Sequence, residues 1–302
     1  MDINSHILSF GEILWDIFPD KRVPGGAPMN VALHLYKLGL KVFFVSRIGQ
    51  DDYGRELKEF LDGSGLNDYD LQEDQQHATG KVQVDLSDSN DPHYDIVFPS
   101  AWDFIEYTDV LDRKAKESHL LVYGSLASRN EESRHTLLHL LDHHDTYNVF
   151  DVNLRYPHYN KERIEILLDR ADVVKMNKAE LEILSQWFNE REEAGDEKKQ
   201  MESLSFAYEL TLVCVTHGAE GASLYYKGEY YRQPAFAVSV GDAVGSGDAF
   251  LAGLLHGLLN HQGPGRMLEY ASATGALVAS KTGANPSYDI GEVHQLIHKK
   301  KQ

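Results

Sequence analysis

The sequence has one cysteine, no long apolar run and a deficit of basic residues. Cys214 alone cannot build an internal disulfide framework, and its place in the apolar stretch 210–215 predicts an inert core residue. No apolar run approaches the roughly 20 residues that span a bilayer, so we expect no membrane partner. Its 29 basic and 47 acidic residues give a formal net charge of −18. That charge argues against nucleic acid as the main partner, because phosphate backbones require a basic face.

The remaining composition is that of a soluble globular protein. Of the 302 residues, 42% are hydrophobic and 25% are charged, which is ordinary for such proteins. This length suits one large α/β domain or two smaller ones. Residues 1–6 lack the basic region and the long apolar segment of a secretory signal. We therefore expect a cytoplasmic enzyme.

Apolar strands alternate with helical patterns along the chain, which predicts right-handed βαβ units and a mainly parallel sheet. The sequence predicts a hairpin with one solvated face over 81–98. It consists of a segment of alternating polarity, 81–86, a polar turn, 87–92, and a second extended segment, 94–98. Buried strands are expected near 7–10, 42–45, 120–125, 149–155, 172–176 and 213–216, and helices from residue 30 and over 55–61, 249–259 and 267–280.

A turn of small residues, Gly245-Ser246-Gly247, precedes Asp248 and an apolar helix. Small residues allow close backbone approach to a ligand, and the first N–H groups of a helix attract an anion such as phosphate. Asp248 at that site could deprotonate a hydroxyl that attacks phosphorus. The alternative is a helix-capping aspartate after a glycine-rich turn.

Two further groups of polar residues could bind ligands. Asp16 and Asn30, on either side of a double glycine, suit recognition of a polyol, although helix capping and a turn would explain them as well. Asp151, Asn153 and Arg155 alternate along a strand end, so they should share a face. Open α/β sheets bind ligands at such strand ends, and a surface Arg155 with a local ion pair is the alternative.

Other patterns allow two interpretations each. Asn177 and Glu180 have the spacing of a helix capping box. Trp102 is either a core or lid-packing aromatic or an apolar wall for a ligand. His135, His139 and His143 recur at helical spacing and could bind zinc, but a solvated helix face is the favoured interpretation.

Two segments resemble the signatures of the PfkB (ribokinase-like) carbohydrate kinases. Asp242, Gly245, Gly247, Asp248 and Phe250 match the second signature, whereas Ala243 departs from the usual hydroxyl or β-branched residue. The first signature matches over 25–32, with glycines at 39 and 49. Similarity to fructokinases rests on 11–16, 101–103 and 124–129.

The resemblance covers nearly the whole chain and implies its fold. We expect an α/β, ribokinase-like three-layer sandwich with a mainly parallel sheet, forming one domain over 1–302. Segments 12–26 and 78–100 would form a small β-lid over the sugar. Free edges of a lid sheet can pair with another subunit, which leaves a homodimer through the lid open.

The resemblance also assigns site residues. Asp248 would be the catalytic base, with Gly245, Ser246 and Gly247 as the anion hole and Arg155 on the transferred phosphate. The sugar would bind to Asp16, Gly25, Gly26, Asn30, Trp102 and Asn153. Asn177 and Glu180 would organise Mg²⁺, Glu180 through water, and ATP would lie along Thr216, Gly218 and Gly221. A monovalent cation, with K⁺ as candidate, would bind at Asp242, Val244 and Ser287.

These expectations combine into phosphorylation of fructose to fructose 6-phosphate by ATP. The first alternative is a kinase for another small sugar or riboside, such as ribose, tagatose, 2-keto-3-deoxygluconate or a nucleoside. The second is a non-catalytic sugar-binding sensor of the same fold, which only Ala243 favours.

Overall fold

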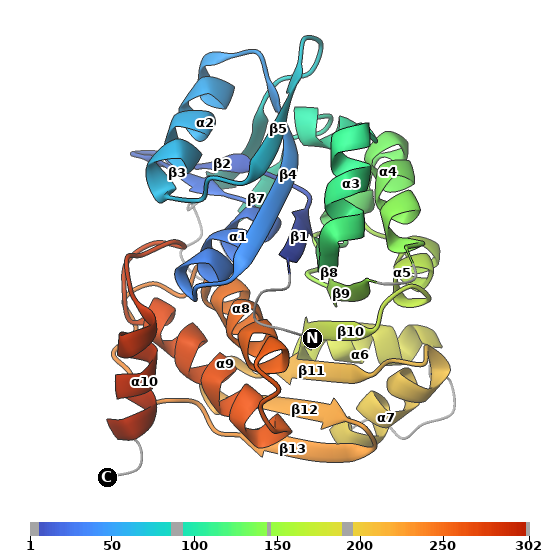
Figure 1. Cartoon of the computed structure of the whole chain (residues 1–302), viewed down its shortest axis with the longest axis vertical. Coiled ribbons are helices and arrows are strands. Elements are labelled where there is room, and N and C mark those ends of the chain that lie inside the picture. Colours follow the sequence, from blue (N-terminus) through green and yellow to red (C-terminus); the bar gives the residue numbers. More distant parts are fainter. Residues whose placement is uncertain (1–5, 86–92, 144–145, 189–195, 300–302) are drawn as a thin grey trace.

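The strands of the protein form two separate sheets in a computed structural model that describes residues 6–85, 93–143, 146–188 and 196–299 (Figure 1). Strands β11 to β5 of the larger sheet run parallel, and β12 and β13 extend it antiparallel. The predicted mainly parallel sheet is confirmed. Its order is β13 (Glu229–Gln233), β12 (Ala222–Tyr226), β11 (Leu212–Thr216), β10 (Val173–Asn177), β9 (Tyr147–Asp151), β8 (Ser118–Gly124), β1 (His6–Phe10), β4 (Lys41–Gly49) and β5 (Tyr69–Asp74).

Helices cover both faces of this sheet because successive strand residues point to opposite sides. On β4, Val42 and Phe44 belong to one buried cluster, and Phe43 and Val45 belong to the other. The first cluster includes α1 (Ala27–Lys37), α2 (Asp52–Ser64), α8 (Ser246–Leu259), α9 (Pro264–Ala279) and α10 (Ile290–Lys299). The second includes α3 (Asp109–Glu117), α4 (Glu131–Leu141), α5 (Lys161–Leu168), α6 (Lys178–Phe188) and α7 (Glu197–Ala207). The result is the predicted three-layer sandwich (Figure 1).

The smaller sheet has the order β3 (Arg22–Gly25), β2 (Leu14–Ile17), β6 (Gly80–Asp85) and β7 (His93–Ile96). All four strands come from segments 12–26 and 78–100. The predicted hairpin is confirmed as the antiparallel pair β6–β7, and the polar turn predicted at 87–92 lies outside the described residues. Short 3₁₀ helices η1 (Ala101–Phe104), η2 (Leu126–Ser128) and η3 (Gly218–Glu220) complete the described elements.

Several element boundaries differ from the sequence prediction. Helix α1 begins at Ala27 rather than Asn30, because Pro28 is tolerated in a first helical turn. Helix α2 begins at Asp52 rather than Arg55, since the Asp51 carboxylate accepts from Gly54 N at 2.8 Å and caps it. Strand β9 ends at Asp151, and Asn153 has a positive φ of 37°. The strand alternation predicted for 151–155 is therefore wrong beyond Asp151.

Two expectations from composition can be compared with the structure. Cys214 is fully buried in β11, as expected for a core residue, and burial raises the pKa of its thiol to about 12. No described helix combines the length and the apolar character that crossing a bilayer requires.

Candidate active site at the carboxyl edge of the sheet

The turn before α8 is shaped to receive a ligand against its backbone. Gly245 has φ +75°, and a Cβ there would lie 2.5 Å from the Ala284 carbonyl oxygen, so only glycine fits. Ser246 folds its hydroxyl back onto the Ala243 carbonyl at 2.7 Å. The Ser246 N–H donates to the Ala243 carbonyl at 3.3 Å. The N–H groups of Gly247 and Asp248 belong to the first turn of a 14-residue helix, where no earlier helical carbonyl can pair with them. This geometry suits the anion site that we expected from the sequence.

Asp248 lies in this first turn, and its carboxylate accepts from Asn30 Nδ2 at 2.8 Å. Burial, followed by the nearby Asp151 charge, raises the pKa of Asp248 to about 7. Lys175, Asn30 and Arg155 act in the opposite direction. A carboxyl group with a pKa near neutrality is suited to general base catalysis.

Lys175 and Asp151 form a buried ion pair beside Asp248 that sequence reasoning missed. Lys175 Nζ lies 3.0 and 3.1 Å from the two Asp151 carboxylate oxygens, and both side chains are largely buried. A Cβ on Gly247 would lie 3.4 Å from the same Nζ, which places the ammonium under the turn Gly245-Ser246-Gly247, the anion turn. The sequence signal for this ion pair was Lys175 inside the predicted apolar strand 172–176, since a buried lysine needs a paired group.

Asp16 of β2 and the double glycine at the end of β3 form a second polar group, in the smaller sheet. A Cβ on Gly25 would lie 2.4 Å from Asp16 Oδ2. Gly26 has a φ of +116°, and a Cβ there would lie 2.3 Å from the Glu12 carbonyl oxygen. Burial raises the pKa of Asp16 to about 6, against the effect of Arg155. The charge of Arg155 thus lowers the pKa of both Asp16 and Asp248.

Glu12 is a further buried acid that the sequence analysis did not single out. Its side chain accepts from the Ala27 N–H at the start of α1, and burial raises its pKa to about 7. The charge of Asp248 also raises this pKa, and that of Arg129 lowers it. A charged residue just beyond β1 was the only signal in the sequence.

Trp102 belongs to the interior of the smaller sheet. It is fully buried with Leu14, Val82 and Val84, and the Arg129 guanidinium lies 3.9 Å from the ring centroid. This position matches the alternative of a lid-packing aromatic rather than a wall that faces the sugar. Arg129 is itself held by both carboxylate oxygens of Asp103.

Asn153 and Arg155 lie in the loop after β9. The Asn153 carbonyl accepts from Ser125 Oγ at 3.2 Å, which ties this loop to the end of β8. Arg155 is exposed. Its position follows from the loop and not from the strand face that we expected.

Asn177 and Glu180 form the predicted capping box at the start of α6. Glu180 N donates to Asn177 Oδ1 at 2.9 Å, and Asn177 N donates to Glu180 Oε2 at 2.8 Å. Leu154 N donates to Glu180 Oε1. Because backbone N–H groups use both carboxylate oxygens, Glu180 fits a metal contact through water better than direct ligation.

The candidate nucleotide loop follows β11. His217 N donates to the Gly221 carbonyl and closes the turn at 2.8 Å. Gly221 has φ +110°, and a Cβ there would lie 2.0 Å from the Gln233 carbonyl oxygen. Gly218 has φ +56°. Thr216 ends β11, next to the end of β10, so this turn lies along the same sheet edge as Asn177.

The three residues predicted for a monovalent cation lie in two neighbouring loops. Asp242 accepts from Val244 N at 3.0 Å and from Gly283 N at 3.3 Å, so its side chain joins the loops. The Ser287 carbonyl accepts from Lys281 Nζ at 2.7 Å. The side-chain oxygens of Asp242 and the carbonyl of Ser287 are therefore already engaged.

A zinc site on α4 receives no support. His135 is exposed, and His139 meets the Tyr107 ring edge to face. His143 lies beyond the end of α4, and its Nε2 is 3.6 Å from an Asp112 oxygen. Within the described ranges, no group of three or more His, Cys, Asp or Glu residues could hold a metal ion.

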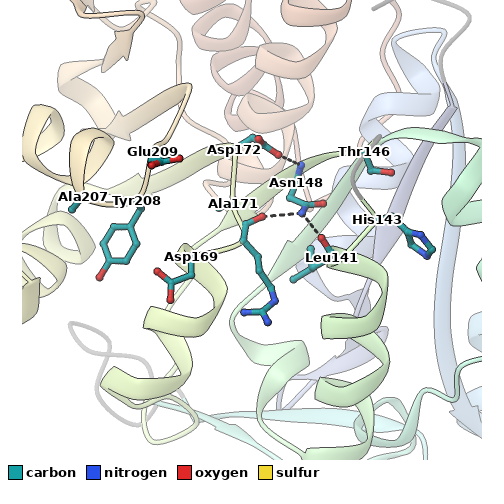
Figure 2. Close-up of a pocket in the computed structure, with 11 residues that line it drawn as sticks. Leu141, His143, Thr146, Asn148, Asp169, Ala171, Asp172, Ala207, Tyr208 and Glu209 are labelled. Atoms are coloured by element: carbon teal, nitrogen blue, oxygen red, sulfur yellow. Dashed lines mark hydrogen bonds between the residues drawn. The ribbon is translucent and has the colours of Figure 1, made fainter.

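A surface pocket of about 410 Å³ lies away from the predicted site. Figure 2 shows Asn148 at its centre, hydrogen-bonded to Asp172, to the Arg170 carbonyl and to the Leu141 carbonyl. Asn148 is near the amino end of β9 and Asp172 precedes β10. This pocket therefore opens at the edge opposite Asp248, and it contains none of the predicted site residues.

The sequence and the fold are similar to those of known carbohydrate kinases. The pattern of the pfkB family carbohydrate kinases matches residues 6–290. The fructokinase of Escherichia coli is 31% identical over 93% of this chain and 95% of its own. A fructokinase of Vibrio cholerae O395 with bound fructose, ADP and calcium ion superimposes with a TM-score of 0.81 at 26% identity, covering 98% and 100% of the two chains.

The ATP-bound fructokinase of Xylella fastidiosa shares the fold, with a TM-score of 0.86 at 23% identity over 99% of this chain and all of that one. The ribokinase-like fold expected from the sequence is thereby confirmed. On the family match and on the relative above 30% identity, the chain belongs to the pfkB family of carbohydrate kinases and is a phosphotransferase that acts on a sugar.

Proposed function

We propose that the protein transfers the γ-phosphoryl group of ATP to fructose, giving fructose 6-phosphate, with Asp248 as the general base. The observation that carries this proposal is Asp248 itself. It lies in the first turn of α8 behind an anion turn, and its pKa is raised to about 7. A group placed there can accept the hydroxyl proton as the oxygen attacks phosphorus.

The surrounding residues support the proposed transfer by charge and position. The N–H groups after Gly245 and the dipole of α8 stabilise negative charge that develops on the transferred group. Arg155 adds a positive charge that lowers the pKa of both Asp16 and Asp248. Asp16 and Asn30 offer a carboxylate and an amide for sugar hydroxyls, and the smaller sheet excludes water, which limits hydrolysis of ATP.

The nucleotide and its metal would lie along the ends of β10 and β11. Thr216, Gly218 and Gly221 border the expected ATP site, and Asn177 with Glu180 would organise Mg²⁺ through water. Mg²⁺ commonly keeps several waters and binds substrate phosphates, so the engaged oxygens of Glu180 fit this group. When bound, the ion neutralises phosphate charge. The proposal further includes a K⁺ site at Asp242, Val244 and Ser287. It also includes a cytoplasmic location and a homodimer that forms through the smaller sheet.

The experiment is a coupled ADP-release assay with ATP, Mg²⁺ and K⁺ against fructose, ribose, tagatose, 2-keto-3-deoxygluconate and a nucleoside. We expect fast turnover on fructose and slow turnover on the others. Turnover on another compound would support a kinase activity but would overturn the assignment of fructose as the substrate. Sugar binding without any ADP release would overturn the proposal in favour of a sensor.

A further inference from the structure

A chain of two asparagines links the loop before α10 to the candidate base. Asn285 Nδ2 donates to Asn30 Oδ1 at 2.6 Å, and Asn30 Nδ2 donates to Asp248 Oδ2 at 2.8 Å. The three residues come from distant parts of the sequence. Their hydrogen bonds all run in one direction, from position 285 towards the carboxylate.

This direction follows from the chemistry of the three groups. An ionised carboxylate can only accept hydrogen bonds, so Asn30 must turn its Nδ2 towards Asp248. Its Oδ1 then faces the other way and requires a donor, which Asn285 Nδ2 supplies. If the Asn30 amide were reversed, its oxygen would face Asp248, and that contact is favourable only when Asp248 carries a proton.

The segment that carries Asn285 is firmly attached to α1 and to the anion turn. Lys37 Nζ donates to the Asn285 and Pro286 carbonyls, both at 3.1 Å. His34 Nε2 lies 3.0 Å from the Ala284 carbonyl oxygen. Ala284 also packs against Gly245, where no Cβ would fit. Asn285 is therefore held at a fixed position relative to both Asn30 and Asp248.

We propose that Asn285 is a positioning residue, whose amide donor sets the orientation of the Asn30 amide and so keeps Asp248 ready to accept a proton. This inference rests on the proposed function, because it concerns the state of the base. Asp248 also faces Asp151 of β9, Lys175 of β10, Arg155 after β9 and Glu12 after β1. Those charges remain unchanged when only position 285 is altered.

The decisive substitution is Asn285→Asp, which preserves size but replaces the donor with an acceptor. Asn30 must then turn its Nδ2 towards position 285 and its Oδ1 towards Asp248. We expect the acidic limb of the kcat–pH profile to move up by about one pH unit or more, which is roughly a tenfold loss of kcat below that limb. Asn285→Ala removes the donor without adding charge and should give a smaller shift in the same direction.

One control tests for an unspecific effect of the Asn-to-Asp change, and a double-mutant cycle separates the effect that passes through Asn30 from that of a nearby added charge. Asn260→Asp makes the same chemical change at the other end of α8, which at about 1.5 Å rise per residue lies roughly 18 Å from Asp248. We expect it to leave the profile unchanged. A double-mutant cycle of Asn285→Asp with Asn30→Ala measures the part that passes through Asn30. If the shift were as large without the Asn30 amide as with it, the inference would be wrong.

The inference can also be tested without turnover. In protein labelled with ¹³C at aspartate side chains, with the Asp248 signal assigned by Asp248→Asn, titration reports the pKa of this group directly. A raised pKa in Asn285→Asp supports the inference even if no sugar in the panel is phosphorylated, whereas an unchanged pKa overturns it even if fructose is a good substrate. Failure of the proposed function is thus distinguishable from failure of the inference.

Discussion

Lys175 of β10 and Asp151 of β9 are direct neighbours in the parallel sheet, and their side chains meet in a buried ion pair below the anion turn. The Lys175 ammonium also lowers the pKa of Asp248, whereas Asp151 raises it. The pair thus connects the interior of the sheet to the charge of the candidate base. The contribution of this ion pair to the free energy of unfolding and its effect on the pKa of Asp248 can be measured separately.

Lys175→Met should strongly destabilise the protein, because it leaves the Asp151 carboxylate buried without its partner. The expected loss is about 3–5 kcal/mol of unfolding free energy, measured by urea denaturation. The double substitution Lys175→Met with Asp151→Asn should recover most of that loss. Equal instability of the single and double variants would show that the lysine matters through packing rather than charge.

Asp248→Asn should lower kcat by about 10²- to 10⁴-fold, the usual contribution of a general base. Its amide oxygen can still accept from Asn30, so the melting temperature should stay close to that of the unaltered protein. In the unaltered protein, kcat should rise with pH through about 7, because the pKa of Asp248 is raised to about 7 and the base must be ionised. Near-normal activity of Asp248→Asn would reject the base assignment.

Glu12→Gln should stabilise the protein at alkaline pH. Burial raises the pKa of Glu12 from 4.5 to about 7 in the folded state. The folded protein therefore binds an extra proton between these values, and the contribution of Glu12 to stability falls as pH rises through that range. Above it the ionised group costs on the order of 3 kcal/mol.

In Glu12→Gln, the amide oxygen still accepts from Ala27 N, but this decline should disappear. Denaturation midpoints of the two proteins should therefore be similar near pH ~4.5 and separate towards pH ~8. Parallel curves over the whole range would contradict the raised pKa.

Gly25→Ala should raise KM for the sugar more than it lowers kcat. The new methyl group would lie 2.4 Å from Asp16 Oδ2 and would displace that carboxylate, while Asp248 keeps its surroundings. Gly63→Ala is the matched control, since a Cβ there meets nothing within 4 Å. Steady-state kinetics that show equal KM values for the two variants would remove Asp16 from the sugar site.

Local sequence patterns determined the layered α/β fold and the helix start at the anion turn. Strand alternation, glycines with positive φ and the helix start at Ser246 are short-range features, so their residues carry the signal where it acts. The same holds for the Asn177–Glu180 capping box. Boundaries were less accurate where a cap decided them, as at Asp51, and the face predicted for Arg155 was wrong because β9 ends four residues earlier.

Tertiary structure decided which polar side chains meet. Lys175 and Asp151 are 24 residues apart, and Asn285 and Asn30 are 255 apart. No period or motif links such positions, because they become neighbours only when parallel strands pair and the loop before α10 packs on α1. The sequence alone thus indicated that Asp248 is a candidate base. Burial and these distant partners set its pKa, since desolvation and Coulomb energies depend on the folded arrangement.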